Sequence, residues 1–226
     1  MLQNWFIQLP ELAFVFFMLS ACLVHRFRRA QTSKTFFTLG KVFLWIIMLL
    51  TVVFYNVSAY PQWFANTSYT TLFKIVMYVA AMAWFYLASK WFLNKNRPSY
   101  LFYQLGFGGL LCLELLISAR TFVAIGVLMP LICVISWKML RLHWDESAVK
   151  EVSRLYAFFA FLFCFLFLCG IAVLHWSYGT LSYDGLQKIF SAQPKSGINV
   201  TAVCFIFSAL FFMLGLAPFH SCFVGM

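Results

Sequence analysis

Charged side chains are scarce in this chain of 226 residues. Only 10% of the residues are charged, and six Asp and Glu stand against sixteen Lys and Arg. Hydrophobic residues make up 64%, and the mean hydropathy is +0.89. Because an ordinary soluble domain carries about 25% charged residues, this composition excludes a water-soluble globular protein. The polar stretches are short, the longest covering roughly 177–198, so no separate aqueous domain is predicted.

Patterns typical of catalytic or metal sites are also missing. The seven cysteines form no Cys-x-x-Cys pair, so we interpret them as small buried hydrophobic residues rather than metal ligands. No Ser/His/Asp set or carboxylate pair is found, and the glycines in 106–109 lie in an apolar run that favours close helix packing over a phosphate loop. The sequons at Asn56, Asn66 and Asn199 are common by chance. The chain is predicted to hold no active site, cofactor or metal of its own.

What the chain has instead is a series of apolar runs. A run of about 20 residues spans a bilayer as a helix. Such runs predict an all-α, polytopic membrane protein with about seven transmembrane helices in a single membrane domain, residues 1–226. The predicted spans are 5–24, 36–57, 71–93, 100–118, 121–140, 153–176 and 199–219.

The basic residues predict the orientation of these spans. Twelve of the sixteen Lys and Arg follow the first, third and fifth spans, and by the positive-inside rule those connections are cytoplasmic. The N-terminus is then expected outside and the C-terminus inside. Because the charge is dispersed over several connections, it indicates contact with anionic lipid and excludes nucleic acid as a partner.

Three charged residues within or beside the spans are candidates for a proton path or for structural roles. Glu114 lies deep in the fourth span, where an isolated carboxylate is costly unless it is paired, hydrated or protonated. It is predicted either to serve a proton path or to be a protonated group bonded to a neighbouring helix, and no lysine partner at depth is evident. Lys74, opening the third span, is predicted to extend to the interface. Arg154, opening the sixth, either makes surface ion pairs or guards a cytoplasmic half-channel.

The last predicted span contains a proline and a histidine. Pro218 is expected to break the helix, which a membrane tolerates where protein or a water-filled cavity satisfies the freed carbonyl. His220 follows within one turn, so its imidazole is predicted either to bond that carbonyl or to pass protons along a wet channel. Broken helices of this kind often mark transport paths.

Two segments carry a resemblance to a known family. The segments 170–183 (Gly-Ile-Ala-Val-Leu-His-Trp-Ser-Tyr-Gly-Thr-Leu-Ser-Tyr) and 214–220 (Leu-Gly-Leu-Ala-Pro-Phe-His) resemble the antiporter-like subunit N of bacterial NADH-quinone oxidoreductase, respiratory complex I. Looser matches fall in the same order at 9–11, 73–75, 116–119 and 146–150. The resemblance covers nearly all of this chain but only about the first half of the family's length, which leads us to expect that the reading frame continues past Met226.

The resemblance implies two inverted repeats of membrane helices, each with a broken helix, in a proton-pumping arm of the bacterial inner membrane. The implied partners are lipid and the other membrane subunits of the complex. NADH, flavin, iron–sulfur clusters and quinone are implied for partner subunits, with none bound by this chain.

Departures from the family leave the role open. Pro130 stands where the family carries a glutamate, Met213 where it carries a lysine before the break, and Leu155 where a lysine opens the sixth helix. One prediction is that the chain contributes to proton translocation coupled to electron transfer from NADH to quinone, using Glu114, His220 and Arg154. The alternatives are a structural, non-pumping subunit of that complex, a subunit of a related cation/proton antiporter or membrane-bound hydrogenase, or an unrelated polytopic protein.

Overall fold

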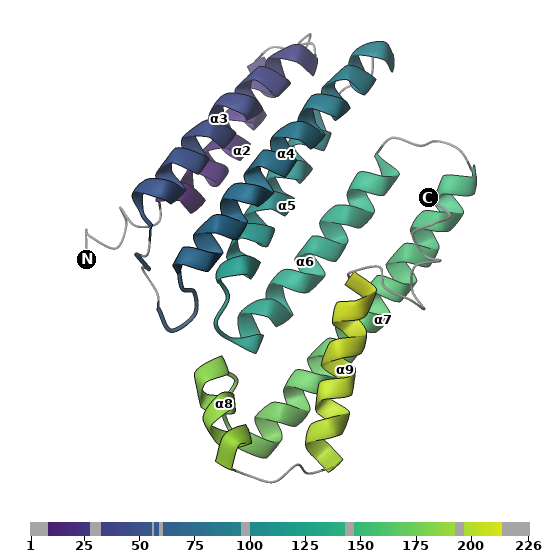
Figure 1. Ribbon diagram of the computed structural model, residues 1–226. Helices are drawn as coiled ribbons and strands as arrows, with labels where there is room; N and C mark the ends of the chain where they lie inside the picture. The colour runs from purple at the N-terminus through teal and green to yellow at the C-terminus, as the bar shows by residue number, and fades with distance from the viewer. Residues whose placement is uncertain are drawn as a thin grey trace. The chain divides into compact units, whose positions relative to one another are not determined.

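The computed structural model describes residues 9–27, 33–55, 57–58, 61–95, 100–142, 147–192 and 197–213. These form helices and irregular connections, and no strand occurs among them, only isolated bridge residues. The helices are α2 Leu9–Phe27, α3 Ser33–Val53, α4 Ser68–Lys95, α5 Tyr100–Ser118, α6 Phe122–Arg141, α7 Ser147–Tyr178, α8 Tyr183–Ala192 and α9 Gly197–Met213 (Figure 1). The predicted all-α membrane fold is confirmed.

Five of these helices are long and apolar enough to cross a membrane: Phe36–Val53, Ser68–Lys90, Tyr100–Ser118, Phe122–Arg141 and Lys150–Tyr178. Two shorter apolar helices, Pro10–Ala21 and Val200–Phe212, fall where the first and last spans were predicted. The predicted break at Pro218 and its neighbour His220 lie outside the described residues.

The chain divides into two compact units, Met1–Ser118 and Ala119–Met226. The single membrane domain expected from the sequence stays a prediction. In the first unit α3 contacts α2, α4 and α5, and α5 also contacts α2 and α4, so the four helices form a bundle (Figure 1). Because α2 to α5 alternate in direction, α2 and α5 are antiparallel.

An aromatic stack fills the centre of the first unit. The ring of Phe107 on α5 lies 3.7 Å from that of Phe17 and 5.3 Å from that of Phe85, with a tilt of 14° to the latter. A Cβ on Gly106 would stand 2.8 Å from the Phe85 ring. Gly106 therefore leaves room for the Phe85 ring of α4, and the close approach of helices predicted for these glycines stays a prediction.

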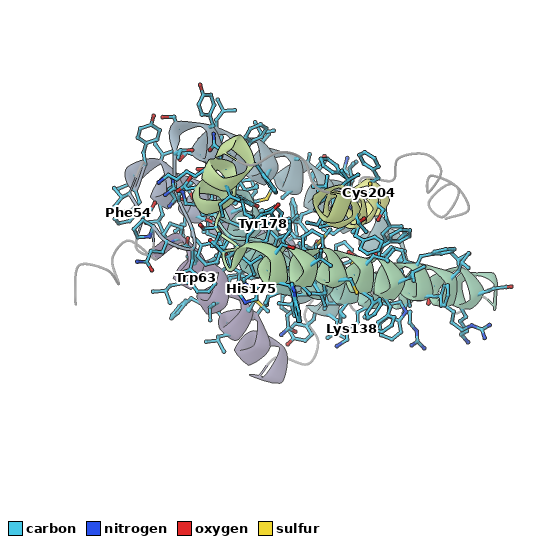
Figure 2. All side chains as sticks on the ribbon, turned by 90° about the horizontal axis from the view of Figure 1, so that it is seen from below. Phe54, Trp63, Lys138, His175, Tyr178 and Cys204 are labelled. Atoms are coloured by element: carbon cyan, nitrogen blue, oxygen red, sulfur yellow. The ribbon has the colours of Figure 1, made fainter. Side chains whose placement is uncertain are left out.

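The second unit is built on α7, which packs against α6 and α9. At one end of this unit Thr121, which precedes α6, forms an isolated bridge with Ser182, which precedes α8. The N–H of Phe122, the first residue of α6, donates to the carbonyl of Leu181 at 3.0 Å. The Tyr183 ring packs edge-on against Phe122, and burial raises the pKa of its hydroxyl. Figure 2 labels Cys204, which is exposed on α9 although cysteines were interpreted as buried.

Replacing Gly170 with alanine is expected to lower the free energy of unfolding by about 1–3 kcal/mol. A Cβ at this position of α7 would stand 2.9 Å from the backbone carbonyl oxygen of Ala202 and 2.8 Å from Ile206, so α9 would have to move away. Reversible unfolding in mixed micelles measures the change.

Gly197→Ala is the matched control, because a Cβ at this position, the start of α9, would have nothing within 4 Å of it. An equal stability for Gly170→Ala and wild type would contradict the close α7–α9 contact.

Candidate functional site

Lys74 on α4 and Glu114 on α5 form a buried ion pair. Lys74 Nζ lies 3.5 Å from Glu114 Oε1, and the side chains are 2% and 0% exposed. They are the buried charged residues of the described part of the chain. The prediction that Lys74 extends to the interface is wrong, as is the prediction that Glu114 has no lysine partner.

The geometry of the two helices explains this correction. Lys74 lies six residues into α4, about 9 Å along its axis, and Glu114 lies four residues before the end of α5, about 6 Å from it. A lysine at this height reaches water only if its helix face is exposed. Lys74 stands on the same face as Tyr78, one turn further on, and that face is turned into the bundle.

Hydrogen bonds of the connecting residues hold the start of α4 next to the end of α5. Thr67 caps α4, since its hydroxyl accepts from the N–H of Thr70 while the Thr70 hydroxyl accepts from the N–H of Thr67. This is a reciprocal capping arrangement with threonine in place of the usual glutamate. The N–H of Ala65 donates to the carbonyl of Ser118 at 2.8 Å, which satisfies the end of α5.

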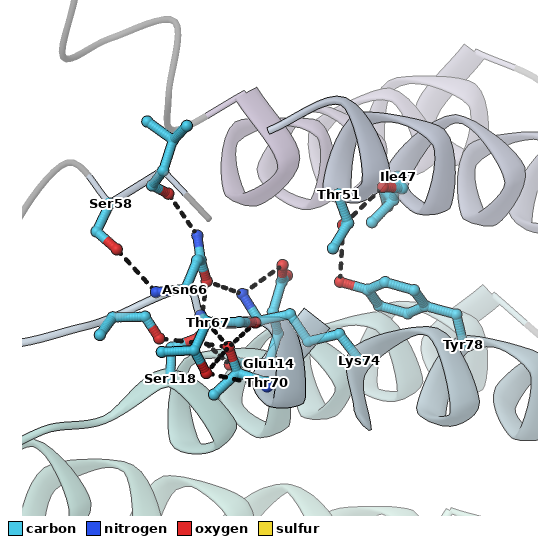
Figure 3. Close-up of polar contacts among 12 residues, drawn as sticks. Ile47, Thr51, Ser58, Asn66, Thr67, Thr70, Lys74, Tyr78, Glu114 and Ser118 are labelled. Carbon is cyan, nitrogen blue, oxygen red and sulfur yellow. Dashed lines mark hydrogen bonds and ion pairs between the residues drawn. The ribbon is translucent and has the colours of Figure 1, made fainter. Parts of the chain in front are cut away.

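Asn66 joins this connection to the ion pair (Figure 3). Its Oδ1 accepts from Lys74 Nζ at 2.9 Å and from Ser118 Oγ at 3.3 Å, while its Nδ2 donates to the carbonyl of Val57 at 3.0 Å. The Asn66 N–H donates to Ser58 Oγ at 2.7 Å. Because Asn66 is half-buried whereas the ion pair is buried, it lies between the pair and the surface of the bundle end.

A second polar layer lies on the side of the pair toward the aromatic stack. The Tyr78 hydroxyl lies 3.4 Å from Thr51 Oγ1, which itself donates to the carbonyl of Ile47 at 2.8 Å (Figure 3). Either hydroxyl can be the donor in the Tyr78–Thr51 contact. Glu114 interacts electrostatically with Tyr78 and with Glu11 on α2.

Such a site is suited to holding and exchanging protons. A lysine and a glutamate 3.5 Å apart, shielded from water, form either a charged pair or a neutral pair that differs by the position of one proton. Membrane-buried ionisable residues of this kind mark ion and proton pathways. The polar groups next to the Glu114 carboxyl are the Lys74 ammonium group and the Tyr78 hydroxyl.

The other predicted candidates are not part of this pair. Arg154 lies on α7 in the second unit and is exposed. Pro218 and His220 lie outside the described residues. Pro130 stands inside α6, and Met213 is the last residue of α9.

Asn66 and one cysteine pair are not among the site residues predicted from the sequence. Asn66 was passed over as part of a sequon, and nothing in its local sequence indicates a lysine contact. Cys133 on α6 and Cys164 on α7 bring their sulfur atoms to 3.7 Å, although they are 31 positions apart. Among the described residues no group of three or more His, Cys, Asp or Glu would hold a metal.

The chain is similar to known membrane proteins. Residues 121–224 match the family described as NADH:quinone oxidoreductase/Mrp antiporter, TM. NADH-quinone oxidoreductase subunit N of Coxiella burnetii is 23% identical over 232 residues, 97% of this chain and 47% of that protein. Subunit N 2 of Rhizobium meliloti is 25% identical over 162 residues, 72% of this chain and 34% of that protein.

A solved structure shares the fold. A chain of respiratory complex I from Thermus thermophilus with bound aureothin matches with a TM-score of 0.73 and 18% identity, over 94% of this chain and 45% of that one. The chain therefore spans less than half the length of the relatives it matches. Together with the apolar helices, these similarities show a multi-pass membrane protein that resembles subunit N and is divergent from it.

Proposed function

We propose that this chain is a membrane-arm subunit of a proton-translocating NADH-quinone oxidoreductase and that it contributes to proton movement through Lys74 and Glu114. The observation that carries the proposal is the buried ion pair at 3.5 Å. The subunit N relatives and the shared fold support the setting. Electron transfer from NADH to quinone, with flavin and iron–sulfur clusters, belongs to partner subunits.

The rest of the proposal concerns the membrane. The chain resides in the bacterial inner membrane with its N-terminus outside, in contact with lipid and with other membrane subunits. In this orientation the connection that carries Asn66 faces outward, so Lys74 and Glu114 stand near the external end of their helices. Arg154 and His220 are the remaining candidates for the path.

A structural, non-pumping subunit is the second candidate. Pro130 and Met213 occupy positions where the resemblance leads us to expect charged residues, and neither carries a proton. No charged residue is buried in the described part of the second unit, which contains α6, α7 and α9. A subunit of a related cation/proton antiporter is a third, since the matched family is described as including Mrp antiporters.

Proton pumping by the assembled complex tests the first proposal. Glu114→Gln and His220→Ala are expected to lower the number of protons translocated per electron in reconstituted vesicles, with quinone reduction retained when the vesicles are uncoupled. Glu151→Gln, an exposed carboxyl on α7, is the control.

An unchanged ratio in both variants rejects the proton role and leaves the structural one. Deletion of the chain separates the alternatives further: intact assembly and quinone reduction without it reject the structural role. Copurification with antiporter subunits in place of oxidoreductase subunits rejects membership of the complex.

A further inference from the structure

Glu11 on α2 is a second carboxyl group beside the ion pair. Its Oε2 is buried and has no hydrogen-bond partner among the described residues. Glu11 interacts electrostatically with both Glu114 and Tyr78. An unpartnered, buried carboxyl oxygen is costly and calls for a physical account.

Packing of α2 places Glu11 on the face that points toward α4 and α5. Phe14, one turn after Glu11 on the same face, has its ring 6.2 Å from that of Tyr78 and 6.0 Å from that of Phe107. Phe107 therefore contacts the same stripe of α2 that carries Glu11.

The aromatic stack also sets the height of Glu11. Phe17 and Phe107 stack at 3.7 Å and so lie at one level of the antiparallel pair α2 and α5. Glu11 lies six residues before Phe17, about 9 Å along the axis, and Glu114 lies seven after Phe107, about 10.5 Å. Since the helices run in opposite directions, both displacements point to the same end of the bundle.

The charge of the site does not balance if every group is ionised. Two carboxylates and one ammonium group leave one net negative charge, with Lys74 and Glu114 buried and Glu11 half-buried with its Oε2 enclosed, and a buried charge without compensation is costly. The hydroxyls of Thr51 from α3 and of Tyr78 from α4 are the neighbouring polar groups, and neither supplies a positive charge at neutral pH. One added proton on a carboxyl oxygen brings the site to neutrality.

We propose that Glu11 belongs to this site and that Glu11 and Glu114 share one proton, which the cluster carries in addition to the Lys74–Glu114 ion pair. The site then holds a proton between two carboxyl groups, and loading or unloading it makes or breaks one O–H bond with no redox change. This inference extends the proposed function, because it names where a proton is stored.

Infrared spectroscopy of the whole chain in lipid vesicles tests the shared proton. The carbonyl stretch of a protonated carboxyl is separate from the carboxylate bands, and the chain has only six Asp and Glu. At neutral pH the wild type is expected to show a band equivalent to one protonated carboxyl. Glu11→Gln is expected to abolish the band, because Glu114 then pairs with Lys74 in the ionised form.

Lys74→Met is the second variant. It is expected to double the intensity of the protonated-carboxyl band, since Glu11 and Glu114 then each take a proton. Glu151→Gln is the control and leaves the band unchanged. Absence of the band in wild type, or an undiminished band in Glu11→Gln, overturns the proposal. The outcome is independent of pumping: an unchanged proton-to-electron ratio in both Glu114→Gln and His220→Ala refutes the proposed proton role but does not remove the infrared band of the wild type.

Discussion

Replacing Lys74 with methionine is expected to lower the free energy of unfolding by about 3–5 kcal/mol, the typical result of removing one partner of a buried ion pair. Lys74 is 2% exposed and Glu114 is fully buried, so water cannot compensate for the lost ammonium group. Glu114 must then remain ionised without a counter-charge or take up a proton, and Asn66 Oδ1 loses its donor at 2.9 Å. Unfolding in mixed micelles measures the loss.

The pH dependence of this variant has a definite sign. At low pH a protonated Glu114 needs no lysine, so the difference between Lys74→Met and wild type is expected to shrink as the pH falls. The double variant Lys74→Met with Glu114→Leu is expected to recover most of the stability, because replacing both members of a buried pair by apolar residues is often neutral.

Lys90→Met is the matched control on the same helix. Lys90 is exposed and rests over the Tyr86 ring at 4.6 Å, so its loss is expected to cost no more than about 1 kcal/mol. Equal losses for Lys74→Met and Lys90→Met would contradict the buried ion pair.

Phe107→Ala is expected to lower the free energy of unfolding by about 3 kcal/mol, at the lower end of the range for a buried phenylalanine. The ring is fully buried and contacts Phe14, Phe17 and Phe85. Because lipid tails are as apolar as a protein core, the loss in a membrane comes from missing van der Waals contacts and the cavity rather than from exposure to water.

Phe73→Ala controls for the general effect of losing a ring. Phe73 lies on α4 and is 61% exposed, so lipid can fill the vacated volume and little change is expected. Comparison of the two variants in the same micelles isolates the contribution of the aromatic stack. A Phe107 variant as stable as the Phe73 variant would show that the stack does not hold the bundle.

Much of the fold follows from local sequence. The predicted spans 100–118 and 121–140 coincide with α5, Tyr100–Ser118, and nearly with α6, Phe122–Arg141. This succeeds because a bilayer requires each spanning segment to satisfy its own backbone bonds, so hydropathy alone marks the helices. The connection predicted over 177–198 contains the short helix α8, which hydropathy does not distinguish from a polar loop.

The candidate site followed from the sequence only in part. Glu114 could be singled out because a carboxylate within an apolar run is costly wherever the helix packs. Lys74 could not be assigned to it, because a lysine near a span end faces either water or the bundle, and helical periodicity does not say which neighbour covers that face. Asn66 and Glu11 gave no signal, since each is ordinary in its own segment.

By itself, the sequence determined that this protein is an all-α membrane protein and which family it resembles. It also determined that Glu114 is the carboxylate whose burial in the membrane interior costs free energy. These properties depend on the order of apolar and polar residues along the chain. Only the tertiary structure decided that Lys74 pairs with Glu114, that Asn66 bonds Lys74 and that Glu11 lies within electrostatic range of Glu114. The reason is that the four residues come from three helices and a connection, and their relative placement is set by how α2, α4 and α5 pack around Phe107 rather than by spacing along the chain.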